Sequence, residues 1–380
     1  MSHFDIEKTR DIATRALSPL SPPSGNFERS DEYRVYREIP HHYYYLIFLL
    51  LVDLLGYKYV GPGEKMAYAI PVELNKKRYS IVYAKFGMKI EYYGDGEPER
   101  VFILLQKGIH AVQKYFEWRA EQAAATSNLN LVTRAASLWE KYLYFREKSE
   151  EHSREAFERR DEVKREEFNR DGIRGTYISH PAYEYRIHAA WTSEAAVDAF
   201  FAWTEHVLVH IAVLQCKLTT GSEVAELVKK EWAAKCKIVM DLSDADDKAS
   251  YDEISDLKSK LRNYVAHGSF GRDGAMFDFH SRVGAVPLRL LDSKRGHDFS
   301  FGDGNSDVAS SDFLKIDRFA KQLFSRSRSP AKAYIESGLP TILSYTLDGR
   351  YASAMASDEA MNGFLEHLHY EWDNAANMDF

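Results

Sequence analysis

The stretch SEAAVDAFFAWTEHVLVHIAVLQCKL, residues 193–218, decides the fold of this chain. Apolar side chains fall on almost every side of a helix drawn through it, which predicts a helix that is buried all round. Two helices are predicted to follow it, from the capping box at 220–223 to about Met240 and from the capping box at 250–253 to Gly268. Two neighbours can scarcely cover such a helix, so we expect a second copy of the chain to cover the rest.

The regions around this bundle predict a protein that is mainly α with α+β parts. Residues 145–170 mix both charge signs without an a/d heptad, which favours a solvated helix that bridges two units. The predicted organisation is a poorly ordered lead at 1–37, an α+β unit with antiparallel strands at 38–127, a long charged helical arm at 128–170, a loop at 171–191, the helical bundle at 192–270, and a strand-helix extension at 271–380.

Composition narrows the classes of protein that this chain can represent. At 380 residues with 45% hydrophobic content, it is expected to form two or three cored units rather than a disordered chain. The 50 Lys+Arg and 57 Asp+Glu give a net charge of -7, which excludes a surface that attracts nucleic acid everywhere. Two cysteines exclude a disulfide framework, and the apolar run at 43–55 is too short to span a bilayer. We therefore expect a cytoplasmic protein with no membrane segment.

The predicted helix at 251–267 concentrates polar residues at its end. Asn263 and His267 are i,i+4 neighbours on the polar face, and Arg262 lies on the flank between the two faces. Gly268 is a natural residue for the position after a helix, which makes His267 the last helical residue. The opposite stripe is the predicted core face, formed by Tyr251, Ile254, Leu257, Leu261, Tyr264 and Val265.

The sequence LRNYVAHG, residues 261–268, resembles the R-x4–6-H signature of the HEPN superfamily. Arg262 and His267 match the two signature positions, and Asn263 matches the polar residue that often follows the Arg. The resemblance covers about 192–270. It implies a helical domain that acts as a metal-independent endoribonuclease, in a bacterial toxin or a phage-defence effector, without a cofactor. It also implies RNA as the substrate, an antitoxin or regulatory partner, and a homodimer through helices 193–218 and 251–267.

Metal-free RNA cleavage requires the residue types that this motif supplies. A base takes the 2′-OH proton and an acid protonates the 5′-oxygen, and histidine serves in either role near neutral pH. Arginine binds a phosphate through two hydrogen bonds and keeps its charge. We expect His267 to be the acid or base, Arg262 to stabilise the phosphate, and Asn263 to hold the imidazole or a phosphate oxygen.

Other residues near the motif are weaker candidates. His206 and His210 have the i,i+4 spacing of metal ligands, but no third ligand stands at a sequence spacing typical of a metal site. A polar contact in the core or at an interface is therefore favoured. Glu205 and these two histidines are instead expected to lie behind the motif. From 193 to 268 there are 9 Lys/Arg against 13 Asp/Glu, a deficit that Arg272 and Arg282 in the loops after the motif would offset by contacting RNA.

Two alternatives to the nuclease hypothesis remain open. The chain is then either a non-catalytic, dimeric HEPN-type ligand-binding or scaffold module, or a metal-dependent hydrolase that uses His206 and His210. RNA cleavage in EDTA separates the first alternative from the nuclease, and metal analysis separates the second.

Overall fold

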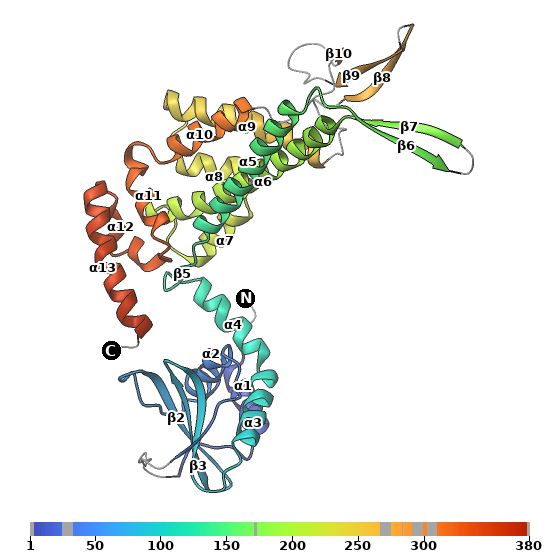
Figure 1. Cartoon of the computed structure of the whole chain (residues 1–380). Coiled ribbons are helices and arrows are strands. Elements are labelled where there is room, and N and C mark those ends of the chain that lie inside the picture. Colours follow the sequence, from blue (N-terminus) through green and yellow to red (C-terminus); the bar gives the residue numbers. More distant parts are fainter. Residues whose placement is uncertain are drawn as a thin grey trace. The chain divides into compact units, whose positions relative to one another are not determined.

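The computed structural model describes residues 4–24, 33–170, 173–266, 275–282, 284–290, 299–301 and 310–377 (Figure 1). It confirms a mainly helical protein with small antiparallel sheets. The chain divides into two compact units, one formed by Met1–Thr126 with Phe364–Phe380 and the other by Ser127–Gly363.

The first unit is a four-stranded antiparallel sheet packed against helices. The strand order is β1-β4-β3-β2, and Ile70, Ile81 and Ile90 form one cross-strand row whose side chains are fully buried. Its main elements are α1 (Ile6–Leu17), β1 (Arg34–Tyr36), α2 (Tyr43–Phe48), the π-helix η1 (Leu49–Leu54), β2 (Met66–Leu74), β3 (Lys77–Ala84), β4 (Gly87–Tyr92), α3 (Pro98–Ala111) and α4 (Gln113–Ala124).

The prediction of a poorly ordered lead at 1–37 is wrong for α1. The helix is capped by Asp5, whose side chain accepts a hydrogen bond from the backbone N–H of Lys8 at 3.0 Å. Leu17 is fully buried against α3, where a Cβ on Gly108 would lie 2.8 Å from Leu17 Cδ2. Burial against a helix about ninety residues further along the chain therefore orders this segment, and local sequence carries no sign of that partner.

The second unit is a helical bundle with three small sheets. Its elements are β5 (Asn130–Leu131), α5 (Ala135–Glu158), β6 (Lys164–Arg170), β7 (Ile173–Ser179), α6 (Pro181–Leu214), α7 (Gly221–Lys229), α8 (Trp232–Val239), α9 (Ala245–Ala266), β8 (Ala275–Ser281), β9 (Gly284–Leu290), β10 (Phe299–Phe301), α10 (Ser310–Leu323), η3 (Arg326–Arg328), α11 (Ser329–Glu336), β11 (Thr341–Ile342), η4 (Leu343–Thr346) and α12 (Arg350–Ala354). The last helix of the chain, α13 (Asp358–Asn377), contains the residues at which the two units divide.

The charged arm differs from its prediction. Helix α5 ends at Glu158, and residues 164–170 and 173–179 pair as the antiparallel strands β6 and β7 instead of forming a helix and a loop. The Phe168 ring lies over Gly175, its direct cross-strand partner, and a Cβ on Gly175 would be 2.6 Å from Phe168 Cζ. This cross-strand contact favours the hairpin, whereas the mixed charges along the segment suggested a solvated helix.

Helix α6 is the centre of the second unit. It begins at Pro181, eleven residues earlier than the bundle was predicted to begin, and runs antiparallel beside α5 (Figure 1). Helices α8, α9 and α11 and the short strand β11 also contact it, and residues 207–214 are all buried. A second copy of the chain is therefore not needed to cover this helix. Among the described residues α6 alone is long and apolar enough to cross a membrane, but 78% of that apolar window is buried, as in a core helix.

The two helices after α6 keep their predicted order but change their bounds. The capping box is confirmed at Thr220, whose hydroxyl accepts from the Glu223 N–H while the Glu223 carboxylate accepts from the Thr220 N–H. Extended backbone at Lys230 and Glu231 divides the predicted second helix into α7 and α8. Helix α9 begins at Ala245 rather than Ser250, because Asp244 accepts the free N–H groups of its first turn.

Candidate functional site

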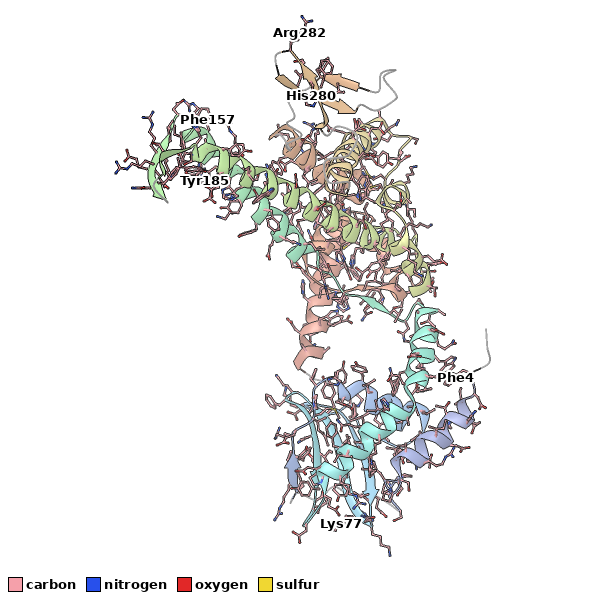
Figure 2. All side chains as sticks on the ribbon, turned by 90° about the vertical axis from the view of Figure 1, so that its right-hand side faces the viewer. Phe4, Lys77, Phe157, Tyr185, His280 and Arg282 are labelled. Carbon is pink, nitrogen blue, oxygen red and sulfur yellow. The ribbon has the colours of Figure 1, made fainter. Side chains whose placement is uncertain are left out.

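The predicted motif lies at the end of α9. The helix is continuous to Ala266, so Arg262 and Asn263 are on its last turns, although their side chains lie outside the described part of the structure. His267 and Arg272 lie outside the described residues altogether. Arg282 is exposed in the turn between β8 and β9 (Figure 2).

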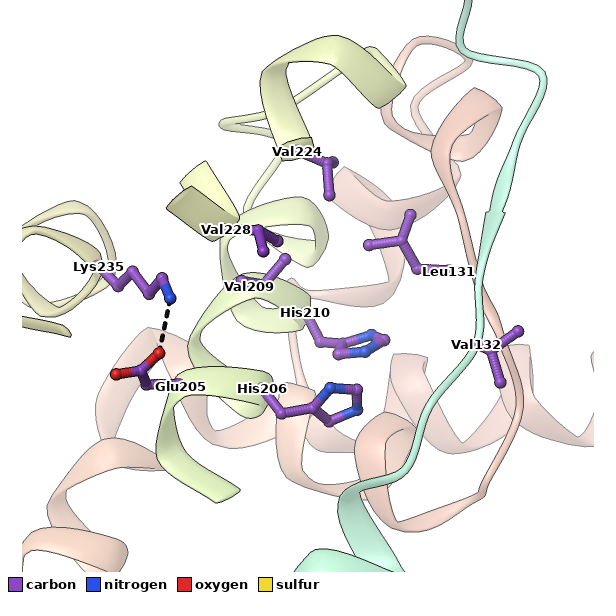
Figure 3. Close-up of a pocket in the computed structure, with 9 residues that line it drawn as sticks. All are labelled: Leu131, Val132, Glu205, His206, Val209, His210, Val224, Val228 and Lys235. Atoms are coloured by element: carbon purple, nitrogen blue, oxygen red, sulfur yellow. Dashed lines mark hydrogen bonds and ion pairs between the residues drawn. The ribbon is translucent and has the colours of Figure 1, made fainter. Parts of the chain in front are cut away.

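Glu205 on α6 is held by lysines from two other helices. Its Oε2 accepts from Lys235 Nζ of α8 at 2.9 Å, and its Oε1 accepts from Lys258 Nζ of α9 at 3.3 Å (Figure 3 shows the first contact). Burial alone would raise the pKa of Glu205, but the hydrogen bonds and charges of the two lysines outweigh it and hold the pKa below its usual value. Glu205 is therefore an ionised structural bridge and not a proton donor at neutral pH.

Lys258 also contacts aromatic rings. Its ammonium lies 4.8 Å from the ring centroid of Phe201 and 5.2 Å from that of Trp232, both within the range of a cation–π interaction. Burial lowers the pKa of Lys258, and the nearby Glu205 carboxylate does not fully offset this effect. The side chain thus ties α9 to α6 and α8 by charge and by packing.

His206 and His210 lie one helical turn apart on α6, with ring centroids 4.5 Å apart. His206 Nε2 accepts a hydrogen bond from the backbone N–H of Arg134 at 2.8 Å, and His210 Nδ1 is 2.7 Å from Thr341 Oγ1. Burial and the Arg134 charge lower the pKa of His206, while burial and the neighbouring His206 lower the pKa of His210 to about 3. Both rings are therefore neutral near pH 7, so they are poorly suited to the proton-donating role expected of a catalytic acid.

These residues line a pocket of about 340 Å³ (Figure 3). The polar residues of its wall are Glu205, His206, His210 and Lys235. Its apolar residues are Leu131, Val132, Val209, Val224 and Val228. The wall combines β5, α6, α7 and α8, four elements that the sequence does not show to be neighbours.

The metal-site alternative finds no support in the described part of the chain. No group of three His, Cys, Asp or Glu side chains there could hold a metal ion. His206 would also have to bind through Nδ1 while Nε2 accepts from Arg134, which would require an imidazolate. Glu205, the adjacent carboxylate, is already engaged by Lys235 and Lys258.

Sequence reasoning identified Glu205, His206 and His210 as candidates but missed their partners. Lys235 resembles an ordinary surface lysine on an eight-residue helix, yet its side chain is only 3% exposed. Thr341 is 131 residues from His210, in a two-residue strand that local propensity does not reveal. The i,i+4 histidine pair was the available signal for the pocket.

Comparison with known proteins returns no match: no family model, no curated protein and no solved structure matches this chain. Its function is therefore inferred from the chemistry of its own residues.

Proposed function

We propose that this chain is a metal-independent endoribonuclease with a HEPN-like helical bundle. His267 acts as the acid or base, Arg262 stabilises the phosphate, and Asn263 orients the imidazole or a phosphate oxygen. The supporting observation is that α9 continues without a break to Ala266, so Arg262 and Asn263 occupy its last turns and His267 follows directly. In sequence, one cation, one amide and one imidazole therefore fall within six residues that include the last turn of this helix.

The anchoring of α9 also supports the proposal, because a catalytic helix must be held rigidly. At the beginning of the helix, Arg328 donates to both Asp247 oxygens, at 2.8 Å from Nη1 and 2.7 Å from Nη2. In the middle, Lys258 binds Glu205 of α6. Lys258 lies four residues before Arg262, so the two positions share one face of the helix.

RNA is the proposed substrate, and the proposed reaction is cleavage of its backbone by attack of the 2′-OH on the adjacent phosphate. The exposed Arg282 is a proposed RNA contact, together with Arg272. The resemblance to HEPN proteins adds an antitoxin or regulatory partner to the proposal, and the composition adds a cytoplasmic location.

A two-fold dimer is part of the proposal, because paired HEPN motifs supply two histidines and two arginines. Its interface cannot use residues 207–214, which are buried within the chain, so the region around the end of α9 is the proposed contact. Light scattering at micromolar concentration tests the dimer, and a monomer at all dilutions contradicts it. Val207→Asp tests whether Val207 lies in the core of one chain or in the dimer contact. Because Val207 is 0% exposed within one chain, we expect this variant to unfold; a folded monomer would instead place Val207 in the dimer contact.

The decisive experiment measures RNA cleavage in EDTA beside a melting curve for each variant. We expect His267→Ala and Arg262→Ala to lose about 10²–10⁴-fold in rate while unfolding free energy changes by about 1 kcal/mol or less. Lys248→Ala, an exposed position on the same helix, is the matched control and keeps its activity. Leu257→Ala, 3% exposed, should instead lose about 2–5 kcal/mol of stability.

The outcomes separate the two HEPN hypotheses. If both motif variants melt and cleave like the parent, the nuclease proposal is wrong. If both unfold, the pair is structural and the non-catalytic module replaces it. The excess of acids over bases from 193 to 268 is the observation that favours this second function.

A further inference from the structure

The tautomer of His206 follows from its partner. A backbone N–H can only donate, so the 2.8 Å contact from Arg134 makes His206 Nε2 an acceptor. The neutral ring must then carry its proton on Nδ1. His206 thus has one N–H donor that the Arg134 contact does not use.

The tautomer of His210 is assigned from the hydrogen-bond requirement of Thr341, because a hydroxyl can donate or accept. Thr341 is 1% exposed, and among the described residues His210 Nδ1, at 2.7 Å, is the one acceptor within reach of its hydroxyl proton. A buried hydroxyl is stabilised by donating its proton, so Thr341 donates to Nδ1. The proton of the neutral His210 ring is then on Nε2.

The two rings therefore present two unused N–H donors at the pocket wall. In the described part of the chain, neither His206 Nδ1 nor His210 Nε2 has a hydrogen-bond partner. The completely sealed, unpaired side-chain atoms there are Gln215 Oε1 and Ser250 Oγ, so both imidazole donors keep access to the pocket. His210 is 2% exposed, and an unpaired donor at that depth calls for an acceptor.

The other residues of the pocket wall indicate the size, polarity and charge of a ligand that would supply this acceptor. The five aliphatic residues favour an apolar body, and about 340 Å³ is within the range of small-molecule pockets. A cationic ligand is disfavoured, because the carboxylate of Glu205 is already bound by Lys235 and Lys258. A ligand anion would compete with Glu205 for Lys235, which is 3% exposed and would have to give up its partner.

We propose that this pocket binds a small neutral molecule with an aliphatic body and a carbonyl oxygen, which accepts hydrogen bonds from His206 and His210. This site is independent of the proposed nuclease motif. A ketone, lactone or amide has the required chemistry, because its oxygen can accept from two N–H donors without bringing a charge into the pocket.

The test uses the full-length chain with ¹⁵N-labelled histidine and follows the ring nitrogens of His206 and His210 by NMR. The probe is cyclohexyl methyl ketone, and cyclohexanecarboxylate and cyclohexylammonium are its charged counterparts. We expect the ketone to shift His206 Nδ1–H and His210 Nε2–H in a saturable manner and the charged compounds to shift neither. Without a probe, the spectra should show Nδ1–H on His206 and Nε2–H on His210.

Val228→Trp places a large ring in the pocket from an exposed position and should abolish the ketone response. Lys229→Trp, the adjacent exposed residue outside the wall, is the matched control and should keep it. The proposal is overturned by saturable binding of the carboxylate at these rings, by binding of ZnCl₂ there, by the opposite tautomers, or by no response to the ketone. None of these readouts requires nuclease activity.

Discussion

Lys258 Nζ of α9 lies 3.3 Å from Glu205 Oε1 of α6, and this contact joins the helix that carries the R-x4–6-H motif to the central helix of the second unit. The same carboxylate binds Lys235, whose side chain is 3% exposed, so two cations share one acidic partner. Removing Glu205 therefore has a larger consequence than removing either lysine.

Glu205→Gln should lower the free energy of unfolding by about 2 kcal/mol, because Lys235 would keep its charge without a counterion. Lys258→Met should cost less, since Lys235 still holds Glu205. Lys248→Met removes a 2.8 Å surface pair with Asp252 on the same helix and should cost about 0.5 kcal/mol or less. Urea unfolding curves check this order, and equal losses for all three variants would contradict the bridging role of Glu205.

His210 should make stability depend on pH below neutrality. Its pKa is about 3 in the folded chain, below the ordinary value of 6.5, so the unfolded chain binds the proton more readily. The stabilisation from a neutral His210 is therefore complete above pH 6.5 and is lost as the pH falls towards 3. Between pH 6.5 and 5 the loss is about 2 kcal/mol.

The matched variant for this dependence is His210→Gln, which retains a polar side chain that can accept from Thr341 but does not titrate. We expect its unfolding free energy to fall less steeply than that of the parent between pH 7 and 5, measured by urea titration at each pH. Parallel curves for the two proteins would show that His210 is not held neutral in the fold.

Arg328 and Arg326 lie in one short segment but should respond differently to substitution. Arg328 is 4% exposed and binds both Asp247 oxygens and the Leu323 carbonyl, a pattern that a lysine cannot reproduce. Arg328→Lys should therefore cost about 2–4 kcal/mol. The Arg326 side chain is 51% exposed beside Asp244 and Asp246, so Arg326→Lys should cost about 1 kcal/mol or less. Thermal melts of both variants measure the difference, and a larger loss for Arg326→Lys would reverse this assignment.

The helical core and the first antiparallel sheet could be predicted because their patterns are local. The apolar side chains on almost every side of residues 193–214 indicate a buried helix. The two runs rich in aromatic and β-branched residues at 66–74 and 77–84, separated by a short turn, indicate two paired strands. The Thr220 capping box was also readable, because its two partners are three residues apart.

The errors arose where a distant partner decides the local structure. Residues 164–170 carry helix-compatible charges, yet they form a strand because residues 173–179 pair with them. Helix α1 is ordered because α3 covers Leu17, and the early first turn of α9 is held by Arg328, which binds Asp247 from 81 residues further along the chain. Pairing and burial of this kind depend on contacts between distant residues, which propensity does not describe.

The sequence by itself determined that the core part of α6, residues 207–214, is buried on every side, that the composition is that of a cored protein, and that Arg262, Asn263 and His267 lie within six residues of sequence. Only the tertiary structure decided what covers α6, since its partners come from α5, α8, α9 and α11 of the same chain. It also decided the states of Glu205 and His210, because burial and the partners supplied by Lys235 and Thr341 set their charge. Charge and tautomer depend on the surroundings of a side chain, and those surroundings exist only after the chain has folded.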